Sequence, residues 1–599
     1  MTLLAERRGT LVTKVALPAE TDIAGQVPRI GVFVCHCGKN IGAYVDVPAV
    51  REYAKTLPFV VFAMDNLYTC SSDTQVIIKQ KIAEHRLNRV VVASCSPRTH
   101  EPLFQQTIRE QGLNVHLFEM ANIRDQCSWV HMDLKREATE KSKDLVRMAV
   151  AKSRLTEPLH AQTLPVTRAA LVVGGGAAGM SAALSLADQG YDTFLVEKSQ
   201  RLGGVAAGIE RNLAGHGIAE HVAGLAKRVA SHPRVTVFVD SHLEKVDGFV
   251  GNFETTIAPN SSNGRHGPAR EPVKVKHGAA VLAVGAGESR PIEYLYGKHP
   301  AVVTLLELER RMAGGGGALG AGATAGTVAF IQCAGSREGD HLYCSRTCCA
   351  AAIKQAIRIK EQSPDTNVLV IYRDVRTYGF RETAYERARE LGVAFIRYEL
   401  DRKPVVEPRG RAGRDGVTVT VRDPILGADL AIPADLLVLS ARVDANPDNG
   451  HLSQLFKVPL NANGFFLEAH AKLRPVDFAT EGVFVCGSAH YPKDTTEAIA
   501  QAKAAAARAA TVLARESIEA EGKTSFVRES RCEACGACVE VCPYHAVEID
   551  PAKNKATVND ALCKGCGICA ATCRSSAIDL KGFRDEQILA VLKTVVTLQ

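Results

Sequence analysis

The sequence predicts an α/β protein of several domains that ends in a small cysteine-rich domain. Strands alternate with helices over most of the chain, a glycine-rich turn directly follows an apolar strand at 169–173, and cysteines recur every three or four residues after Gly522. Such alternation indicates βαβ units and a parallel sheet. At roughly 150 residues per domain, the 599 residues are enough for about four domains.

Composition and charge exclude several classes of protein. With 46% hydrophobic and 23% charged residues the chain is globular rather than disordered, and its net charge of +7 is spread without a run of five or more like charges. A nucleic-acid partner is therefore not expected. No stretch reaches the ~20 uncharged apolar residues of a membrane span. The alanine-rich run 498–514 contains Lys503 and Arg508, which predicts a surface helix.

The use of cysteine predicts a cytoplasmic protein. The first residues lack the apolar segment of a secretory signal, and most of the 18 cysteines fall in tight groups. Clustered cysteines in a cytoplasmic protein are typical of metal ligands or catalytic thiols rather than of a disulfide framework.

We divide the chain into four parts. They are an N-terminal extension (1–28), an N-terminal α/β domain (29–153), a core (154–522) and a C-terminal domain (523–599). The elements expected in the second part are strands at 30–34, 59–63 and 90–93, helices at about 47–57 and 73–86, and a charged linking helix at about 132–153. Those expected later are strands at 169–173, 279–284, 327–332 and 482–485, helices at about 304–312, 495–519 and 584–596, and loop insertions at 260–272 and 314–326.

The C-terminal domain carries two copies of the spacing C-x2-C-x2-C-x3-C. This duplicated spacing is that of bacterial ferredoxins with two [4Fe–4S] clusters, in which the fourth cysteine of each run ligates the other cluster. One cluster would take Cys532, Cys535, Cys538 and Cys573, and the other Cys563, Cys566, Cys569 and Cys542. Gly536, Gly565 and Gly567 permit the tight turns. Eight cysteines in this spacing disfavour the alternative, a structural zinc site.

The core predicts a dinucleotide site. Its residues are Gly174, Gly176, Ala177, Ala178 and Gly179, which form a G-x-G-x-x-G turn between a strand and a helix. Glycines there allow a tight turn and a close approach of the backbone to a pyrophosphate, which the helix N-terminus favours. Glu197 ends the next strand, where a ribose-binding carboxylate belongs. The alternative is a glycine-rich turn without a ligand.

Two further segments favour FAD over NAD. Lys198 and then Arg201-Leu202-Gly203-Gly204 follow the acid, as in thioredoxin-reductase-like flavoproteins with two dinucleotide-binding domains. Near the other end of the core, Gly487-Ser488 precedes the 495–519 helix and resembles the second flavin contact of those proteins. They usually carry an acidic residue at the position of Ser488, so the ribityl contact is expected to differ.

The core lacks the second nucleotide turn that such reductases use for a nicotinamide. The strand 327–332 instead runs into a cysteine, and three more follow; the set is Cys333, Cys344, Cys348 and Cys349. Four thiolates suffice for one [4Fe–4S] cluster. Two alternatives stay open from the residues alone: small buried apolar side chains, or a redox dithiol.

The N-terminal domain carries four cysteines at strand ends, on one edge of the expected sheet. They are Cys35, Cys37, Cys70 and Cys95. They could hold a further cluster or be packing residues, and the residues alone do not decide between these. His36, His100 and Cys127 are expected to pack around the set or to hydrogen-bond to it.

Taken together, these residues resemble the A-type component of heterodisulfide reductase, HdrA, over about residues 29–596. The most specific segments are VCHCG (34–38), YTCS (68–71), ASCSPRTHEPLF (93–104) and ANIRDQCSWV (121–130). The resemblance implies a thioredoxin-reductase-like FAD core that bifurcates electrons, a cluster on the 333–349 set beside the flavin, and a cluster on the N-terminal set. It also implies a flavin-proximal Lys354, for which an exposed surface lysine is the alternative.

The resemblance further implies the partners. They are HdrB/HdrC-like disulfide-reducing proteins, ferredoxin, and a donor such as a hydrogenase, a formate dehydrogenase or an NADH-oxidising module, with a dimer of this chain inside the larger complex. Some members insert a ferredoxin domain into the flavin core, but residues 205–285 contain no cysteine, so that insertion is absent.

Three functions follow from these observations. The first is an electron-distributing, electron-bifurcating component of a heterodisulfide-reductase-like complex. The second is an NAD(P)H:ferredoxin oxidoreductase of the glutamate-synthase small-subunit type, which the cysteine at position 333 disfavours because it occupies the place of the second nucleotide turn. The third is a redox-sensing scaffold, for which so many redox groups would be excessive.

Overall fold

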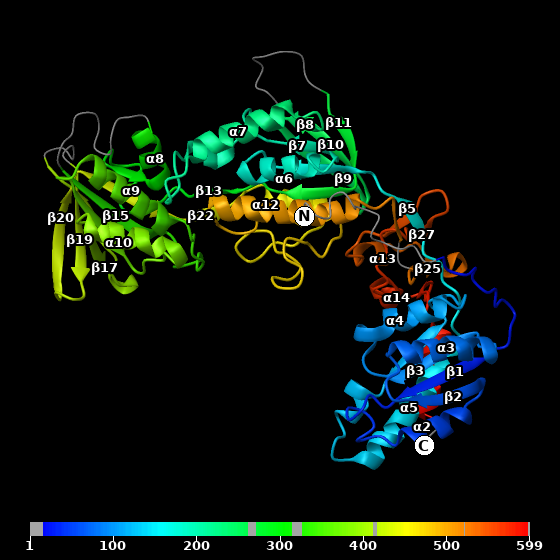
Figure 1. Ribbon diagram of the computed structural model, residues 1–599. Helices are drawn as coiled ribbons and strands as arrows, with labels where there is room; N and C mark the ends of the chain where they lie inside the picture. The colour runs from blue at the N-terminus through cyan, green and yellow to red at the C-terminus, as the bar shows by residue number, and fades with distance from the viewer. Residues whose placement is uncertain (1–15, 261–270, 314–325, 411–415, 520–521, 597–599) are drawn as a thin grey trace. The chain divides into compact units, whose positions relative to one another are not determined.

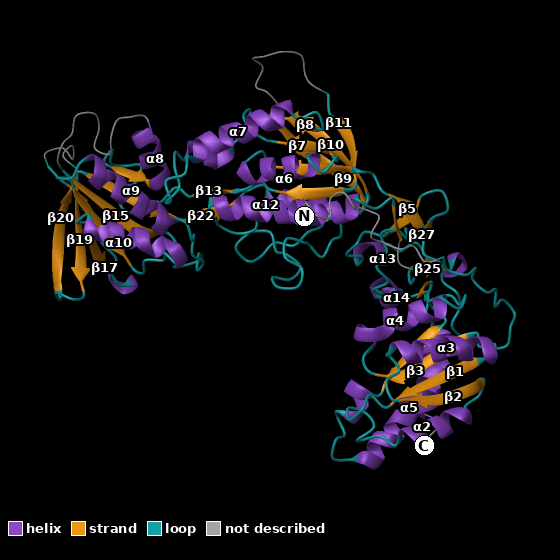
Figure 2. Ribbon diagram, in the orientation of Figure 1, coloured by secondary structure: helices purple, strands orange, loops and turns teal. Residues whose placement is uncertain are grey.

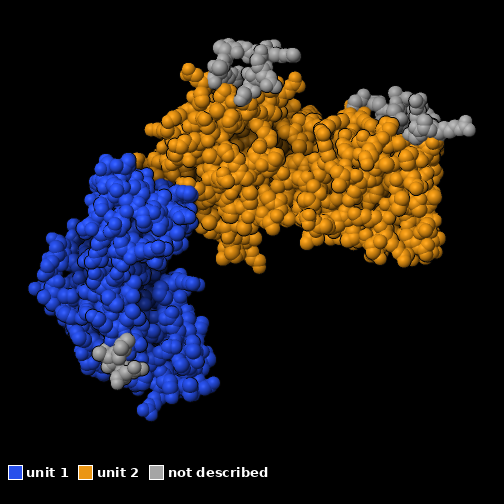
Figure 3. Space-filling view, turned by 180° about the vertical axis from the view of Figure 1, so that it is seen from behind, with its two compact units in different colours: residues 1–163, 519–599 blue, residues 164–518 orange. Residues whose placement is uncertain are grey.

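The computed structural model describes residues 16–260, 271–313, 326–410, 416–519 and 522–596 (Figure 1). Most of the two expected loop insertions therefore lies outside the described residues. The chain forms two compact units, unit 1 (residues 1–163 and 519–599) and unit 2 (164–518), coloured separately in Figure 3. The chain passes from one unit to the other within β5 (Thr163–Pro165) and again within β24 (Ser517–Glu519), and these two strands pair with each other. No helix in the described part of the chain combines the length and apolar character that a membrane span needs.

The N-terminal part of unit 1 is built on a four-stranded parallel sheet in the order β2-β1-β3-β4. Its elements are β1 (Ile30–Cys35), α2 (Val47–Lys55), β2 (Val60–Asn66), α3 (Ser72–Glu84), β3 (Arg89–Ser94), α4 (Pro97–Arg109), β4 (Phe118–Asn122), the π-helical turn η1 (Arg124–Ser128) and α5 (Lys135–Ser153). Strands β1 and β3 are buried throughout, as expected for central strands of a parallel sheet covered on both faces.

Helix α5 corrects one expectation from the sequence. Its charged composition predicts a link between domains, but it packs on β4 and α2, with Ala138, Val146 and Val150 in the core. These small and branched residues share one face, while the many lysines and acids occupy the other faces. The charged surface hides a narrow apolar stripe that composition alone does not reveal.

The C-terminal part of unit 1 has an internal repeat of strand and short helix. Its elements are β25 (Ser525–Val527), η7 (Glu529–Arg531), α13 (Ala537–Glu540), β26 (Val547–Asp550), β27 (Lys555–Val558), α14 (Ile568–Thr572), β28 (Ile578–Leu580) and α15 (Asp585–Val596). Helix α15 packs on α5 of the N-terminal part. There the Gln587 side chain donates to the carbonyl of Leu155 at 2.9 Å, and Arg584 pairs with Glu157 at 2.7 Å.

Unit 2 contains two lobes of the same layered design (Figure 2). The first lobe has a five-stranded parallel sheet in the order β23-β12-β6-β7-β8. Helices α6, α7 and α12 cover one face of that sheet, and a three-stranded antiparallel sheet, β11-β10-β9, covers the other together with α11. The elements of this lobe are β6 (Ala169–Val173), α6 (Ala177–Ala187), β7 (Asp192–Val196), η2 (Gly204–Gly208), α7 (Ile218–Ser231), β8 (Val235–Phe238), β9 (Ser241–Phe249), β10 (Asn252–Pro259), β11 (Val273–His277), β12 (Ala279–Leu282), α11 (Asn449–Phe456), β23 (Val483–Val485), η6 (Gly487–Ala489) and α12 (Thr495–Leu513).

The second lobe repeats this arrangement with the sheet order β14-β21-β15-β16-β17. Helices α8, α9 and α10 pack on one face, and the antiparallel strands β18-β19-β20 on the other. Two short antiparallel strands, β13 and β22, connect the lobes. The elements are β13 (Ala286–Glu288), β14 (Val302–Thr304), α8 (Leu305–Ala313), β15 (Thr327–Ala334), α9 (Cys348–Gln362), β16 (Asn367–Tyr372), η3 (Gly379–Arg381), α10 (Glu382–Glu390), β17 (Ala394–Arg397), η4 (Leu400–Arg402), β18 (Val405–Pro408), β19 (Val417–Asp423), β20 (Ala428–Ala434), β21 (Leu436–Ala441) and β22 (Val443–Ala445).

Helix α12 is shorter than expected. The alanine-rich run predicts a surface helix reaching residue 519; α12 ends at Leu513, exposes Lys503 and Arg508, and packs its other face on α6. Its buried side chains are Ala498, Ala502, Ala505, Ala506, Ala509 and Leu513. Alanine at this spacing lets two helices approach closely, so the run serves packing, while Lys503 stays on the exposed face.

The antiparallel sheet of the first lobe contains a histidine that should make folding acid-sensitive. His277 is fully buried, with its ring nitrogens 2.8 Å from the Thr255 hydroxyl and 3.0 Å from the Ala279 carbonyl, and burial lowers its pKa from 6.5 to about 4. Because the unfolded chain binds the proton first, stability is expected to be lost as the pH falls from 6.5 toward 4, by up to about 3 kcal/mol. Urea unfolding of unit 2 across this range should show a smaller loss in His277→Asn, and equal slopes would contradict this.

Candidate dinucleotide and iron–sulfur sites

The glycine-rich turn lies between β6 and α6, as its spacing predicts. A Cβ on Gly174 would lie 2.4 Å from the carbonyl oxygen of Ala283, and one on Gly179 would lie 1.8 Å from that of Gly174, so both positions require glycine. A Cβ on Gly176 would meet nothing within 4 Å. The open space beside Gly176, at the N-terminus of α6, is where a pyrophosphate could approach the backbone.

The acid at the end of β7 closes this turn. Glu197 is buried, and its carboxylate accepts hydrogen bonds from the backbone N–H of Gly175 at 2.6 Å and of Ser199 at 2.8 Å. Gly203 donates its N–H to the Gly175 carbonyl, and Gly204 approaches Gly176 closely. The structure thus brings the predicted acid and the second glycine pair to the same turn.

Four predicted residues lie within or at the edge of this turn. Ala177 and Ala178 form the buried first turn of α6. Lys198 is exposed and pairs with Asp448 at 2.8 Å, and Arg201 lies exposed in the following loop. Lys198 and Arg201 therefore stand at the rim of the turn rather than inside it.

The second predicted flavin contact lies beside the glycine-rich turn. Gly487 has a φ of +70°, and a Cβ on it would lie 2.9 Å from that of Ala178, so the loop after β23 touches α6. Ser488 follows it at the start of η6. Asp494 caps α12 by accepting the N–H of Glu497 at 2.8 Å. Two segments from opposite ends of the core thus meet in one place.

The second lobe brings its four cysteines together at the carboxyl end of β15. Cys333 is the penultimate residue of that strand and has a φ of +62°, and Cys348 and Cys349 open α9. Hydrogen bonding to Cys349 and burial raise the pKa of the Cys348 thiol, and Cys333 and Cys344 act in the same direction. The same hydrogen bond lowers the pKa of Cys349. Four thiols this close together are a donor set suited to a cluster, which binds them all as thiolates.

Arginines surround this set and tie it to the first lobe. Arg337 reaches within 3.9 Å of the Cys333 sulfur, and the backbone N–H of Arg346 donates to the Cys344 sulfur at 3.3 Å. The Arg346 side chain continues to the first lobe, where it donates to the Pro492 carbonyl at 3.3 Å and to Glu497 at 3.1 Å. One residue thus connects the cysteine loop to the first turn of α12.

Lys354 lies on α9, five residues after Cys349, and makes a buried ion pair. Its ammonium donates to both oxygens of Glu309 on α8, each at 2.8 Å, and to the carbonyl of Arg211 at 2.9 Å. The Glu309 side chain is only 3% exposed and that of Lys354 16%. Glu309 also accepts the N–H of Glu210, so the pair touches the segment that follows Gly203 and Gly204.

The two C-terminal cysteine runs interleave. Gly536, Gly565 and Gly567 all have positive φ, as the tight turns require. Burial raises the pKa of Cys569, and the neighbouring Cys563 and Cys542 raise it further. The last cysteine of the first run therefore lies near the second run, which is one half of the crossing that the duplicated spacing predicts.

Backbone N–H groups point at the sulfurs of several of these cysteines. The donors and acceptors are Ser525 to Cys563 (3.4 Å), Ala546 to Cys542 (3.2 Å), Ala556 to Cys532 (3.3 Å) and Ala577 to Cys573 (3.3 Å). Hydrogen bonds of this kind stabilise thiolates and set the potential of iron–sulfur clusters. Among the described residues, no three His, Cys, Asp or Glu side chains lie close enough to hold a single metal ion.

The N-terminal cysteines lie together at the carboxyl edge of the parallel sheet. Cys35 ends β1 and accepts the N–H of Thr69 at 3.4 Å. Burial raises the pKa of Cys95, Cys37 and Cys70 raise it further, and Arg124 lowers it. The four thiols and one guanidinium thus share one site.

The three residues expected around this set, His36, His100 and Cys127, lie in different places. His36 pairs with Asp65 at 2.7 Å, beside the set. His100 lies on α4, which begins two residues after Cys95. Cys127 is fully buried and its thiol donates to the Ala138 carbonyl at 2.9 Å, so it holds η1 onto α5.

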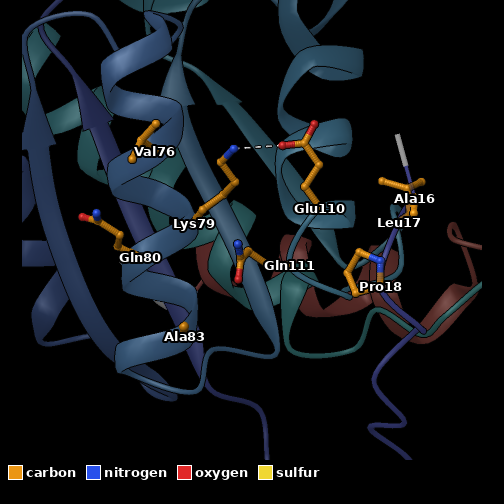
Figure 4. Close-up of a pocket in the computed structure, with 9 residues that line it drawn as sticks. All are labelled: Ala16, Leu17, Pro18, Val76, Lys79, Gln80, Ala83, Glu110 and Gln111. Atoms are coloured by element: carbon orange, nitrogen blue, oxygen red, sulfur yellow. Dashed lines mark hydrogen bonds and ion pairs between the residues drawn. The ribbon is translucent and has the colours of Figure 1, made fainter. Parts of the chain in front are cut away.

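A pocket elsewhere in unit 1 contains none of the predicted site residues. It has a volume of about 490 Å³ and lies between α3, the end of α4 and the segment Ala16–Pro18 (Figure 4). The ion pair of Lys79 with Glu110, 2.9 Å long, spans its wall.

Two protein-family models match parts of these sites. Residues 172–241 match the family described as NAD(P)-binding Rossmann-like domain, and residues 531–577 match the 4Fe-4S dicluster domain. In Methanopyrus kandleri, the second iron–sulfur A-type component of CoB–CoM heterodisulfide reductase is 39% identical over 88% of this chain and 92% of its own length. The chain belongs to the HdrA family of heterodisulfide reductases.

Other members of the HdrA family match nearly the whole chain. In Methanothermobacter thermautotrophicus, the A-type component of the H₂:CoB–CoM heterodisulfide,ferredoxin reductase is 38% identical over 96% of this chain and 98% of its own length. Among solved structures, Lactococcus lactis thioredoxin reductase in the FR conformation covers 58% of this chain and 99% of its own, with a TM-score of 0.40 and 16% identity. The chain is thus an oxidoreductase, a flavoprotein with 4Fe–4S clusters, as the motifs predict.

Three residues of this HdrA chain join the predicted sites without belonging to any motif: Glu309, Arg346 and Lys493. Glu309 has a signal in the sequence, because it stands among Leu305, Leu308 and Met312 on the apolar face of α8. Arg346 and Lys493 have none, since surface loops are rich in such residues and only the fold brings these two together.

A substitution in the glycine-rich turn tests the assignment of the dinucleotide site. Gly179→Ala is expected to reduce bound flavin to under a tenth and to destabilise unit 2 by about 3 kcal/mol, because the new methyl group overlaps the Gly174 carbonyl. Flavin absorbance after gel filtration and urea unfolding measure both effects. Gly224→Ala is the matched control: Gly224 lies in α7 with open space around its Cβ, so alanine should stabilise by about 1 kcal/mol. Full flavin content in Gly179→Ala would contradict the assignment.

Proposed function

We propose that this chain distributes electrons within a heterodisulfide-reductase-like complex. It would pass them between a donor partner, ferredoxin and a disulfide-reducing partner of the B/C type, with the FAD splitting electron pairs between two routes. When bound, FAD supplies two-electron and the clusters one-electron redox chemistry. The protein side chains hold these groups at fixed positions and tune them, and no acid–base residue is required.

The observation that carries this proposal is the cysteine set in place of a second nucleotide turn. In the second lobe, β15 and α9 are joined by the loop of Cys333, Cys344 and Cys348, whose thiols converge. A ligand on this set would stand at the carboxyl end of a parallel sheet, where α/β proteins bind their ligands. The second lobe would then receive single electrons from the flavin instead of a hydride donor.

Flavin binding is assigned to the first lobe. The turn 174–179 would hold the pyrophosphate, Glu197 the ribose, and the loop of Gly487 and Ser488 the flavin end. Lys354 would face the flavin ring from the second lobe, with Glu309 fixing its ammonium. The ion pair of Lys354 on α9 with Glu309 on α8 is largely buried, which argues against the alternative of an exposed surface lysine.

Cluster binding is assigned to unit 1 and to the second lobe. Two clusters would lie on the C-terminal runs, one on the 333–349 set and one on the N-terminal set, where Arg124 would offset negative charge. Relatives of this chain are named as reductases of the CoB–CoM heterodisulfide that use ferredoxin or H₂. We propose the same class of partner for this chain, a disulfide-reducing protein, but we do not propose the CoB–CoM heterodisulfide as its substrate.

Iron and flavin content of the anaerobically purified full chain, with EPR of the reduced form, tests the proposal. We expect about one FAD and about sixteen irons per chain, in clusters of four. A content of about twelve irons would mean that the N-terminal set holds no cluster. A content of about eight would mean that neither the N-terminal set nor the 333–349 set holds one. That result would overturn the proposal in favour of an NAD(P)H:ferredoxin oxidoreductase, which NADPH oxidation would then test.

A further inference from the structure

Lys493 is a buried lysine in the loop between Ser488 and α12. Its residue is only 7% exposed, and its ammonium donates to the carbonyl oxygens of Gly487 at 2.5 Å and Tyr491 at 3.1 Å. It also lies 3.8 Å from the centre of the Tyr491 ring. The side chain is thus folded back under the turn that carries the predicted flavin contact.

This ammonium has no carboxylate partner among the described residues. The acids nearest to it are engaged elsewhere: Glu497 pairs with Arg346, Glu468 accepts the N–H of Val476, and Asp494 pairs with Arg381. Burial lowers the pKa of Lys493 to about 7. Arg346 acts in the same direction, while Cys486, Glu497 and Glu468 act against it. An unpaired buried charge is costly, and such charges concentrate at functional sites.

The position of Lys493 coincides with a departure from the flavoprotein pattern. Where thioredoxin-reductase-like flavoproteins usually carry an acid, this chain has Ser488, whose hydroxyl donates to the Lys493 carbonyl at 3.5 Å. The turn lacks that negative charge and holds a positive one directly beneath it. The N-terminus of α12, which begins two residues later, adds a positive dipole end.

We propose that Lys493 places a positive charge at the flavin-binding turn and so favours the reduced flavin. Two-electron reduction with uptake of one proton leaves one extra negative charge on the flavin, and the electrons come from a reduced iron–sulfur partner protein. A buried ammonium beside that charge stabilises it, because the site is poorly screened. The inference rests on the proposed flavin site, and Lys493 acts as a positioning and electrostatic residue, not as a proton donor.

The test is the flavin midpoint potential of the anaerobic full-length holoprotein, measured by spectroelectrochemistry at a pH about one unit below the pKa of Lys493. At a fixed potential, Lys493→Met should lower the ratio of reduced to oxidised flavin about tenfold, equal to about 30 mV for two electrons. Lys493→Arg should restore most of it. Lys503→Met is the matched control, since Lys503 lies exposed on the neighbouring α12, and it should leave the ratio unchanged.

The outcomes separate the inference from the proposed function. A wild-type protein without flavin overturns the proposed function, whereas a flavin-loaded Lys493→Met with the wild-type ratio overturns the inference. A loss of thermal stability without a change in that ratio shows a purely structural role and also overturns it. Should Lys493→Met fail to fold, Lys493→Gln decides, because it removes the same charge and keeps a donor for the Gly487 carbonyl, and an unchanged ratio in that variant rejects the inference.

Discussion

Replacing Cys349 with alanine is expected to lower the iron content by about four atoms per chain and to slow electron transfer from the flavin at least a hundredfold. A [4Fe–4S] cluster needs four ligands, and Cys349 is one of four converging thiols in the second lobe. Without the cluster proposed there, the flavin would lose the one predicted cluster site of unit 2 as its electron acceptor. Iron analysis with EPR of the reduced protein measures the first effect, and stopped-flow reoxidation of the flavin the second.

Cys486 provides the matched control for this experiment. It is a fully buried cysteine of unit 2 that directly follows β23, and it belongs to none of the converging sets. Cys486→Ala removes a buried thiol of the same size and should leave the iron content unchanged. An equal iron content in Cys349→Ala and Cys486→Ala would mean that the 333–349 set holds no cluster and that its thiols are packing residues or a dithiol.

Removing Glu309 is expected to be among the most destabilising single changes in unit 2. Glu309→Ala leaves the Lys354 ammonium without its carboxylate in a largely buried place, which costs about 3 kcal/mol. Gln355, which also donates to Glu309 at 3.0 Å, loses an acceptor as well. The midpoint of urea unfolding measures the effect.

A double variant shows whether the unpaired charge is the cause. Glu309→Ala with Lys354→Met removes both charges and should recover most of the lost stability, because an uncompensated buried charge is what destabilises the single variants. The exposed Glu361 of α9 is the control, and its replacement by alanine should cost under about 0.5 kcal/mol. A Glu309→Ala protein as stable as that control would show that Lys354 does not depend on Glu309.

Locally determined features could be predicted from the residues. The turn at Gly174 and the runs around Cys532 and Cys563 depend on spacing over short stretches of chain, so sequence suffices for them. The buried faces of α5 and α12 could not be predicted in this way, because they depend on what lies opposite each helix. Composition gives the average polarity of a helix, whereas packing depends on a single face.

By itself, the sequence determined which groups this protein offers to ligands: a glycine-rich turn after a strand, an acid one strand later, and thiols at cluster spacing. These follow from short-range geometry that a motif encodes directly. Only the tertiary structure decided which distant groups share a site, such as Gly487 with Ala178, Lys354 with Glu309, and Arg346 with Pro492. The physical reason is that parallel strands bring their carboxyl ends to one edge, whatever the length of chain between them, and that the helices between those strands lie side by side on the sheet.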